Sequence, residues 1–352
     1  MRRLPIYFLI DVSESMVGEP ISQVEEGIST IIQALKTDPT AIETVWISII
    51  AFAGKAKTIL PLQDIISFYP PKYPIGSGTS LSNGLRHLMN ELDNNVRKTT
   101  PTAKGDWKPL IFLFTDGVPT DNTDPVITEW KQRWQRSVNL VAVSFGSEAN
   151  AGILAQLTEH VLFFKNANID SYKYFFKWVT ASITTTSVNI ESNGTGINLE
   201  KADNDWLSKI DISKSAPVMQ LVDDNYVVLL ARCQQSSRHY LIKYRKNIGS
   251  NTWGDMQLQT RSYLQVGAYP LKDDYFELSD ASAGNHKINT AELVGAPTCP
   301  CCSNQFALAQ CSCGKLHCIG YEEMNTCPWC GKTSRYVVVE DGGGFDVNRT
   351  QG

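Results

Sequence analysis

The stretch Leu4-Pro5-Ile6-Tyr7-Phe8-Leu9-Ile10-Asp11-Val12-Ser13-Glu14-Ser15 decides the fold of the first half of this chain. Its apolar run, residues 4–10, predicts a buried strand, and a polar string follows directly at the end of that strand. Residues 46–52 and 110–114 are likewise apolar on both faces. Strands of a parallel sheet that helices cover on both sides have this composition.

Such strands alternate with amphipathic segments along the first half of the chain. Strands are predicted at 4–10, 45–52, 56–60, 110–115, 138–145 and 160–164, and helices at 20–36, 81–97, 124–137, 150–157 and 171–183. This alternation predicts an α/β fold with a doubly wound, mostly parallel, Rossmann-like sheet. In the strand order 3-2-1-4-5-6, ligands bind at the carboxyl ends of strands one and four. Asp11 and Asp116 end these two strands, so we expect their carboxylates to meet there.

The residues at this sheet edge predict a divalent-ion site. Mg²⁺ takes oxygen ligands in octahedral array and usually receives only one or two carboxylates from a protein. The predicted ligands of Mg²⁺, or of Mn²⁺, are two carboxylates and three hydroxyls: Asp11, Ser13, Ser15, Thr79 and Asp116. In the alternative interpretation Asp11 and Ser13 cap the helix that begins near Pro20, and Asp116-Gly117 forms a turn.

These segments together resemble the metal-ion-dependent adhesion site of von Willebrand factor A domains, and the resemblance covers about residues 1–185. It implies that Ser13 and Ser15 bind the ion directly. It also implies that Thr79, Asp11 and Asp116 bind directly or through water. The ion of such a site leaves one coordination position toward solvent, which an Asp or Glu of a protein partner can fill.

Length and composition predict a cytoplasmic protein with more than one domain. The chain has 352 residues, of which 42% are hydrophobic, enough for ordinary cores. The net charge of −4 provides no general surface for polyanions, so neither nucleic acid nor an acidic membrane is a favoured partner. The apolar run at 4–10 ends at Asp11 without a cleavage site, and no segment is long enough to span a membrane.

The cysteines indicate metal ligation. All nine except Cys233 lie between Cys299 and Cys330, and such crowding without a secretion signal favours metal over disulfides. The predicted Zn²⁺ ligands are Cys299, Cys302, Cys311, Cys313, His317, Cys318, Cys327 and Cys330. Cys233 is expected to have an ordinary structural role.

Eight ligands are enough for two closed tetrahedral Zn²⁺ sites, which would fold the segment and perform no chemistry. Two pairings remain open. In the first, Cys299, Cys302, Cys327 and Cys330 share one ion, and Cys311, Cys313, His317 and Cys318 share the other. In the second, the pairs are cross-braced, as in RING domains.

The rest of the chain divides by composition. From 184 to 205 apolar residues are too sparse for a core. The predicted organisation is an A-type domain at 1–185, a linker at 186–205, a β-rich region at 206–296, a zinc-binding module at 297–340 and a flexible tail at 341–352.

A second resemblance concerns the C-terminal half. Its motifs are Pro297-Thr298-Cys299-Pro300, Cys313-Gly314-Lys315-Leu316-His317-Cys318, Cys327-Pro328-Trp329-Cys330-Gly331, Gly267-Ala268-Tyr269-Pro270 and Asp274-Tyr275-Phe276. They resemble the TerY proteins of bacterial tellurite-resistance, stress and phage-defence systems, and with the A domain they cover nearly the whole chain. The resemblance implies that a protein kinase and a PP2C-type phosphatase are the partners. It does not imply that this chain handles tellurite.

Three functions compete. We favour a non-enzymatic interaction or scaffold protein that recognises a partner's acidic residue through Mg²⁺. A Mg²⁺-dependent phosphohydrolase is the second, but Ser13 stands where aspartyl-phosphate enzymes carry a second acid. The third is a zinc-ribbon nucleic-acid binder or RING-like ligase. Residues 296–340 hold equal numbers of acidic and basic side chains, without the basic footprint that phosphate contacts need.

Overall fold

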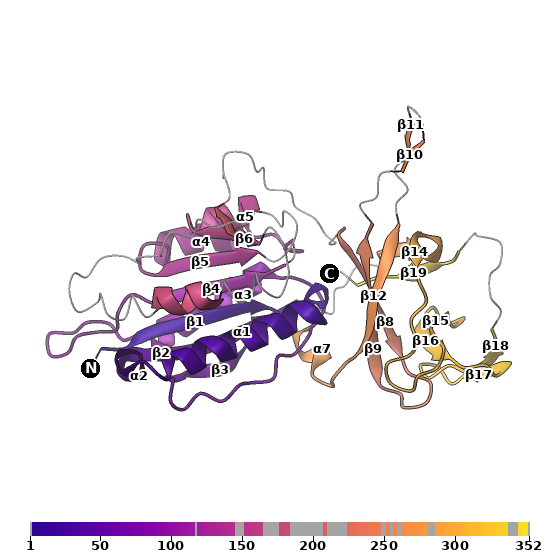
Figure 1. Ribbon diagram of the computed structural model, residues 1–352, viewed down its shortest axis with the longest axis horizontal. Coiled ribbons are helices and arrows are strands. Elements are labelled where there is room, and N and C mark those ends of the chain that lie inside the picture. Colours follow the sequence, from indigo (N-terminus) through magenta and orange to yellow (C-terminus); the bar gives the residue numbers. More distant parts are fainter. Residues whose placement is uncertain are drawn as a thin grey trace.

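The computed structural model describes residues 2–116, 118–144, 151–164, 176–183, 207–209, 224–247, 251–253, 256–258, 262–280, 286–336 and 344–350. Figure 1 shows two bodies side by side, one from the first half of the chain (indigo to magenta) and one from the second half (orange to yellow). We call the second body, residues 224–350, the C-terminal domain. The linker predicted at 186–205 lies outside the described residues.

The first body contains a seven-stranded sheet in the order β3-β2-β1-β4-β5-β6-β7. Its strands are β1 (Leu4–Asp11), β2 (Val45–Phe52), β3 (Ala56–Asp64), β4 (Leu110–Thr115), β5 (Asn139–Ser144), β6 (Val161–Phe164) and β7 (Leu207–Lys209). Only β3 and β7, at the two edges, pair antiparallel with their neighbours. The predicted doubly wound, mostly parallel α/β sheet is therefore confirmed. Residues 207–209, which were predicted to belong to the β-rich region, extend this sheet instead.

Helices cover both faces of the sheet. One face packs against α1 (Glu19–Leu35) and the helical residues 176–183. The other face packs against α3 (Leu81–Asn95), α4 (Asp124–Arg133) and α5 (Ala151–Leu157). A short helix that was not predicted, α2 (Pro39–Thr44), begins where the Asp38 side chain accepts hydrogen bonds from the backbone of Thr40 and Ala41. An Asp cap followed by Pro at the first helical position is a standard helix start.

The core follows from the alternation of side chains along the central strands. On β1, Phe8 points to the face covered by α1, and its neighbours Tyr7 and Leu9 point to the opposite face. The rings of Phe8 and Phe112 stack with centroids 5.6 Å apart, and those of Phe112 and Phe114 with centroids 6.4 Å apart. This aromatic layer crosses the β1–β4 junction and fixes the strands whose ends carry the predicted ion ligands.

Replacing Phe112 by Ala should lower the free energy of unfolding by about 3–5 kcal/mol, because the residue is fully buried and a cavity would remain. Denaturant titration of both proteins checks this. Tyr69→Ala is the matched control, since that aromatic side chain is 82% exposed and its loss should cost less than about 0.5 kcal/mol. Equal stability of Phe112→Ala and the wild type would contradict the packing described here.

The C-terminal domain has a six-stranded sheet in the order β14-β12-β9-β8-β16-β15. Its strands are β8 (Tyr226–Arg232), β9 (His239–Lys246), β12 (Tyr263–Pro270), β14 (Leu293–Val294), β15 (Phe306–Gln310) and β16 (Leu316–Ile319). Because β16 from the cysteine-rich segment pairs with β8, the β-rich region and the zinc module that were predicted separately share one sheet.

Smaller elements complete this domain. They are α7 (Tyr275–Leu278), the hairpin of β10 (Asn251–Trp253) and β11 (Met256–Leu258), the hairpin of β17 (Met324–Thr326) and β18 (Thr333–Arg335), and the pair of β13 (Lys287–Asn289) with β19 (Asp346–Asn348). In Figure 1, α7 lies on the side of the domain that faces the first body.

The flexible tail predicted at 341–352 is wrong for residues 346–350. Val347 on β19 is 1% exposed and belongs to the core of the C-terminal domain. The backbone amide of Thr350 donates to the carbonyl of Val228, and that of Arg349 to the carbonyl of His286. The Gly-rich sequence before β19 concealed a strand of three residues, of which only Val347 is buried. Among the described residues, no helix has the length and apolar character needed to cross a membrane.

Candidate metal centres

The carboxylates of Asp11 and Asp116 meet at the carboxyl ends of β1 and β4. The hydroxyl of Thr115 donates to Asp11 Oδ2 at 2.7 Å, and the hydroxyl of Ser15 donates to Asp116 Oδ1 at 2.7 Å. Ser13 Oγ lies 2.9 Å from Ser15 Oγ. The amide of Ser13 donates to Asp11 Oδ1 at 2.9 Å, so the structure brings four of the five predicted ion ligands into one hydrogen-bonded group.

Thr79 reaches the same edge from a loop between β3 and α3, residues 76–79, which we call the Thr79 loop. The amide of Gly76 donates to the carbonyl of Val12 at 2.9 Å and Ser13 forms a parallel bridge with Gly76. On its other side, Thr79 exchanges hydrogen bonds with Thr120, from its amide to Thr120 Oγ1 at 3.0 Å and from the Thr120 amide to its carbonyl at 2.9 Å. The Thr79 loop is therefore fixed against the segment that carries Asp11, Ser13 and Ser15.

The donor chemistry of this site fits Mg²⁺ or Mn²⁺. It offers two carboxylates and three hydroxyls, all oxygen ligands, and none of these five side chains is more than 5% exposed. Two acidic groups drawn together in a buried place repel each other unless a cation lies between them. The capping interpretation is not supported, because α1 begins after Gly18 and receives no side-chain cap.

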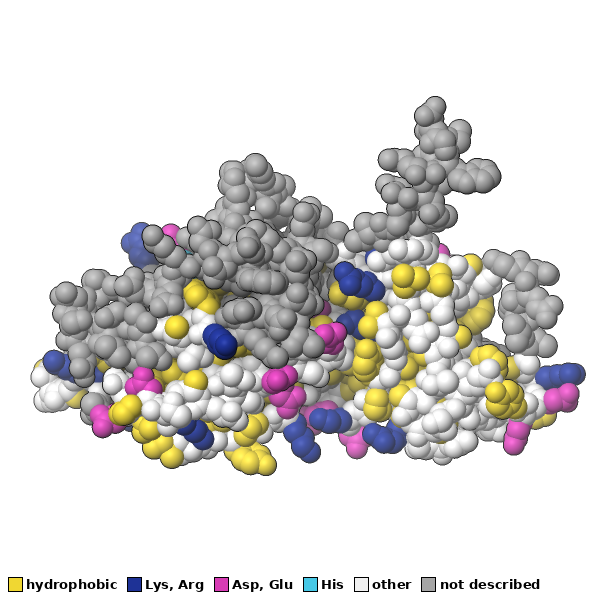
Figure 2. All heavy atoms as spheres, in the orientation of Figure 1, with side chains coloured by type: hydrophobic (Ala, Val, Ile, Leu, Met, Phe, Trp, Pro, Cys, Tyr) yellow, Lys and Arg dark blue, Asp and Glu magenta, His cyan; other side chains and the backbone are white. Residues whose placement is uncertain are grey.

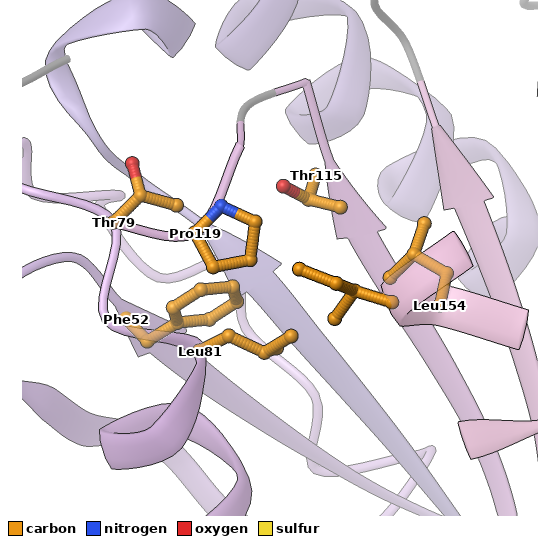
Figure 3. A pocket seen from close by; sticks show the side chains of 7 residues that line it. Phe52, Thr79, Leu81, Thr115, Pro119 and Leu154 are labelled. Carbon is orange, nitrogen blue, oxygen red and sulfur yellow. The ribbon is translucent and has the colours of Figure 1, made fainter. Parts of the chain in front are cut away.

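An apolar hollow adjoins the ion site. It is lined by Phe52, Thr79, Leu81, Thr115, Pro119, Ile153 and Leu154. Figure 3 shows Pro119 between the side chains of Thr79 and Thr115, with Phe52 and Leu81 beside them. One wall of the site is therefore apolar, which strengthens electrostatic interactions inside it.

Eight cysteines of the C-terminal domain form two groups of four. The first tetrad is Cys233, Cys299, Cys302 and Cys318, and the second tetrad is Cys311, Cys313, Cys327 and Cys330. Within each tetrad all four sulfur atoms lie within 4.8 Å of one another. The tetrads interleave along the sequence, as in the cross-braced pairing. The pairing of Cys299 and Cys302 with Cys327 and Cys330 is not found.

The sulfur positions fit zinc. The Sγ–Sγ distances are 3.7 Å for Cys302 and Cys318, 3.7 Å for Cys311 and Cys330, and 3.9 Å for Cys313 and Cys327. A tetrahedral Zn²⁺ with Zn–S bonds of about 2.3 Å separates its sulfurs by about 3.8 Å. A disulfide would require about 2.05 Å. Each tetrad could therefore hold one Zn²⁺ with four protein ligands.

His317, which was predicted to bind zinc, lies outside both tetrads. Its Nδ1 is 2.9 Å from the carbonyl of Cys318 and its Nε2 is 2.7 Å from the hydroxyl of Tyr336. His317 and Cys318 are neighbours on β16, so their side chains point to opposite faces of the sheet, and only Cys318 faces the first tetrad. Cys233 provides the fourth sulfur instead.

Sequence reasoning missed Cys233, although a local signal was present. The turn after β8 repeats the geometry of the cysteine turns. The amide of Ser237 donates to the carbonyl of Cys233, as the amides of Ser303 and Gly331 donate to those of Cys299 and Cys327. Ser237 has φ 57°, close to φ 61° for Ser303 and φ 74° for Gly331. Cys233-Gln234-Gln235-Ser236 is thus a knuckle in which Ser236 stands where the second cysteine would be.

One thiol in each tetrad has a lowered pKa. Burial raises the pKa of Cys233, but hydrogen bonds from Ser236 outweigh it and bring the pKa to about 7. Burial likewise opposes ionisation of Cys311, and hydrogen bonds from Cys313 and the other sulfurs bring its pKa to about 6. Burial raises the pKa of the Cys302 and Cys318 thiols in the first tetrad and of the Cys327 thiol in the second. Thiolates are the form that binds metal, so it is the sulfur positions, and not the pKa directions, that indicate a metal site.

Comparison with known families agrees with both sites. Residues 6–178 match the von Willebrand factor type A domain, and residues 223–352 match the TerY-C metal binding domain. The fold and the two kinds of site thus define a class, a metal-binding protein built on a von Willebrand factor type A domain. The order of the two domains makes the chain a TerY-like protein, which confirms the resemblance seen in the sequence.

Several solved structures are similar to part of this chain. Proximal thread matrix protein 1 from the mussel byssus, solved with a zinc-occupied MIDAS motif, is 19% identical over 51% of this chain and 45% of its own, with a TM-score of 0.38. The PilB minor pilin from Streptococcus sanguinis is 13% identical over 55% and 64%, with a TM-score of 0.39. BatB from Bacteroides thetaiotaomicron is 15% identical over 52% and 99%, with a TM-score of 0.35. The chain spans about half the length of the mussel protein.

Proposed function

We propose that this chain is a non-enzymatic interaction protein that binds a partner through a metal ion. Asp11, Ser13, Ser15, Thr79 and Asp116 would hold Mg²⁺ or Mn²⁺, and an Asp or Glu of the partner would complete its coordination. The observation that carries the proposal is a pair of buried carboxylates that each accept a hydrogen bond from a hydroxyl group at 2.7 Å, Asp11 from Thr115 and Asp116 from Ser15. Because the ligands are nearly inaccessible, a partner would recognise the ion and not the ligands.

The donor set supports binding more than hydrolysis. Phosphoryl transfer through an aspartate requires a nucleophile and a second group that moves a proton. Here Ser13, a neutral hydroxyl, occupies the position two residues after Asp11, and its oxygen lies beside Ser15 Oγ. Both carboxylates accept hydrogen bonds from hydroxyls, as expected of ligands held in place for an ion.

The C-terminal domain would provide a second contact surface whose fold depends on zinc. A tetrad with four protein ligands leaves no open position on the metal, so its role is structural. The eight cysteines of the tetrads form no disulfide, which favours a reducing compartment, and we place the protein in the cytoplasm. On the TerY-like architecture, we propose a protein kinase and a PP2C-type phosphatase of a bacterial tellurite-resistance, stress or phage-defence system as partners.

Partner capture should require the ion. We expect the wild type to retain the co-encoded kinase or phosphatase in a pull-down with Mg²⁺ and to lose at least about 90% of it in Mg²⁺-free buffer, since the ion would supply the link. Thr79→Ala and Asp116→Ala should each weaken capture, and the double variant should be no worse than the stronger single one, because both residues serve one ion.

The matched control is Asp93→Ala, which removes a carboxylate on α3 that pairs with Arg133 at the surface. It changes the net charge as Asp116→Ala does and should leave capture unchanged. Zinc content is measured in every sample, so that loss of zinc is not mistaken for loss of Mg²⁺. Full capture by Asp116→Ala in Mg²⁺-free buffer would show that the ion site is not the docking surface.

A further inference from the structure

Two loops of the ion site are held by the C-terminal domain. One is the segment 11–17, which contains three of the proposed ligands and which we call the Asp11 loop; the other is the Thr79 loop. Figure 1 shows α7 and β9 beside the first body at this place. Figure 2 shows Lys, Arg, Asp and Glu side chains gathered at the surface over the same junction. The contacts beneath that surface are buried.

Lys243 on β9 reaches the backbone of the Asp11 loop. It is 2% exposed, and its Nζ donates to the carbonyls of Ser15 and Val17, the latter at 3.1 Å. The ring of Tyr226 lies 4.6 Å from the same nitrogen. Burying an ammonium group is costly unless it is well bonded, and an apolar residue of similar length would fill the space without that cost. Lys243 is therefore better explained as a residue that holds the Asp11 loop than as one that only fills the core.

Tyr275 on α7 binds the same loop through Glu14, a fully buried carboxylate. The Tyr275 hydroxyl donates to Glu14 Oε1, and the hydroxyl of Ser77 on the Thr79 loop donates to Glu14 Oε2 at 3.2 Å. Burial, and then the charge of Glu14, raise the pKa of Tyr275 far above its usual range, so the hydroxyl remains protonated and donates. Glu14 thus links both loops to α7.

The segment that follows Tyr275 packs directly on the Thr79 loop. The amide of Ser77 donates to Ser279 Oγ at 2.9 Å, and the amide of Asp280 donates to the carbonyl of Ser77 at 3.2 Å. A Cβ on Gly76 would lie 2.8 Å from Cβ of Leu278, closer than real contacts allow. Backbones packed this closely move together.

We propose that Lys243 and Tyr275 are positioning residues of the ion site, which hold the Asp11 and Thr79 loops from the C-terminal domain and so make ion affinity depend on that domain. The inference rests on the proposed function insofar as it takes the five oxygen ligands to bind Mg²⁺. Since coupling between sites is reciprocal, ion binding would also stabilise the contact between the two bodies. Partner binding at the ion site would then be sensed by the C-terminal domain.

Calorimetric titration of the full chain with Mg²⁺ tests this. Lys243→Met and Tyr275→Phe should each weaken Mg²⁺ binding by about fivefold or more, the lower end of typical coupling between sites. The matched control is Lys57→Met, which breaks the ion pair of Lys57 with Glu277 of α7 at 2.9 Å. That pair also crosses between the bodies, but both side chains are at least 58% exposed. Its loss should leave Mg²⁺ affinity unchanged.

Zinc content and circular dichroism show whether each variant is folded. Tyr275→Phe removes a single oxygen, so it decides the matter if Lys243→Met fails to fold. Wild-type Mg²⁺ affinity in a folded Tyr275→Phe protein with a full zinc content would overturn the inference. Absence of Mg²⁺ binding by the wild type would instead overturn the ion site itself, and the two failures are thus distinguishable.

Discussion

Replacement of Cys233 by Ala should reduce the zinc content from about two ions per chain to about one, and the C-terminal sheet should lose its fold. The first tetrad would keep three ligands, and structural zinc contributes about 10–16 kcal/mol of binding free energy in small zinc modules. Cys233 also directly follows β8, a central strand of the C-terminal sheet, and is fully buried. Elemental analysis of protein purified without added metal measures the loss.

Two control variants make this result specific. His317→Ala should retain about two zinc ions, because the ring contacts Tyr336 and not a tetrad. Cys301→Ala should also retain them, because Cys301 lies between two ligands in sequence but belongs to neither tetrad. Zinc loss in His317→Ala, with a full content in Cys233→Ala, would restore the ligand set first inferred from sequence.

The second large effect is expected at the ion site. Asp11→Asn should weaken Mg²⁺ binding by at least about 100-fold, because the amide keeps the shape of the side chain but removes one of two negative charges from a hard cation. Thr115→Val should have a smaller effect of about 10–100-fold, since Thr115 orients Asp11 and does not bind the ion itself. Calorimetric titration gives both values.

Stability without Mg²⁺ separates an ion ligand from a structural residue. With no ion present, the thermal midpoint of Asp11→Asn should equal or exceed that of the wild type, because removing one buried carboxylate relieves repulsion with Asp116. A large fall in the midpoint, with Mg²⁺ affinity unchanged, would assign Asp11 to capping and not to the ion.

The sequence predicted the first body well because its signals are local and repeated. Runs that are apolar on both faces predict the central strands, and the predicted strand order brings the ends of β1 and β4, with Asp11 and Asp116, together as the structure has them. Parallel sheets leave little freedom once strands and crossovers are assigned. Residues 207–209, which form β7, were assigned to the β-rich region because a strand of three residues is too short to show a pattern of apolar and polar side chains.

The C-terminal domain was predicted less well because its ligands are joined across long stretches of chain. Strands β9, β12 and β14 lie between Cys233 and Cys299 in the sequence, so spacing rules that look for neighbouring pairs chose His317 instead. Those rules detect a turn that carries two cysteines. They do not detect the pairing of β16 with β8, which brings Cys318 to Cys233. The burial of Lys243 could not be predicted either. A single lysine in an apolar strand is expected at the surface, and its partner, the Asp11 loop, lies in another domain.

The β9 strand faces two different parts of the molecule with alternate side chains. Tyr240, Ile242 and Tyr244 belong to the core that contains the first tetrad, whereas Leu241 packs with Val17 against the first body. Lys243 shares the orientation of Leu241, because side chains alternate along a strand. Adjacent positions of β9 thus belong to two different sites: a change at Tyr240, Ile242 or Tyr244 concerns the core beside the first tetrad, and a change at Leu241 or Lys243 concerns the contact with the first body.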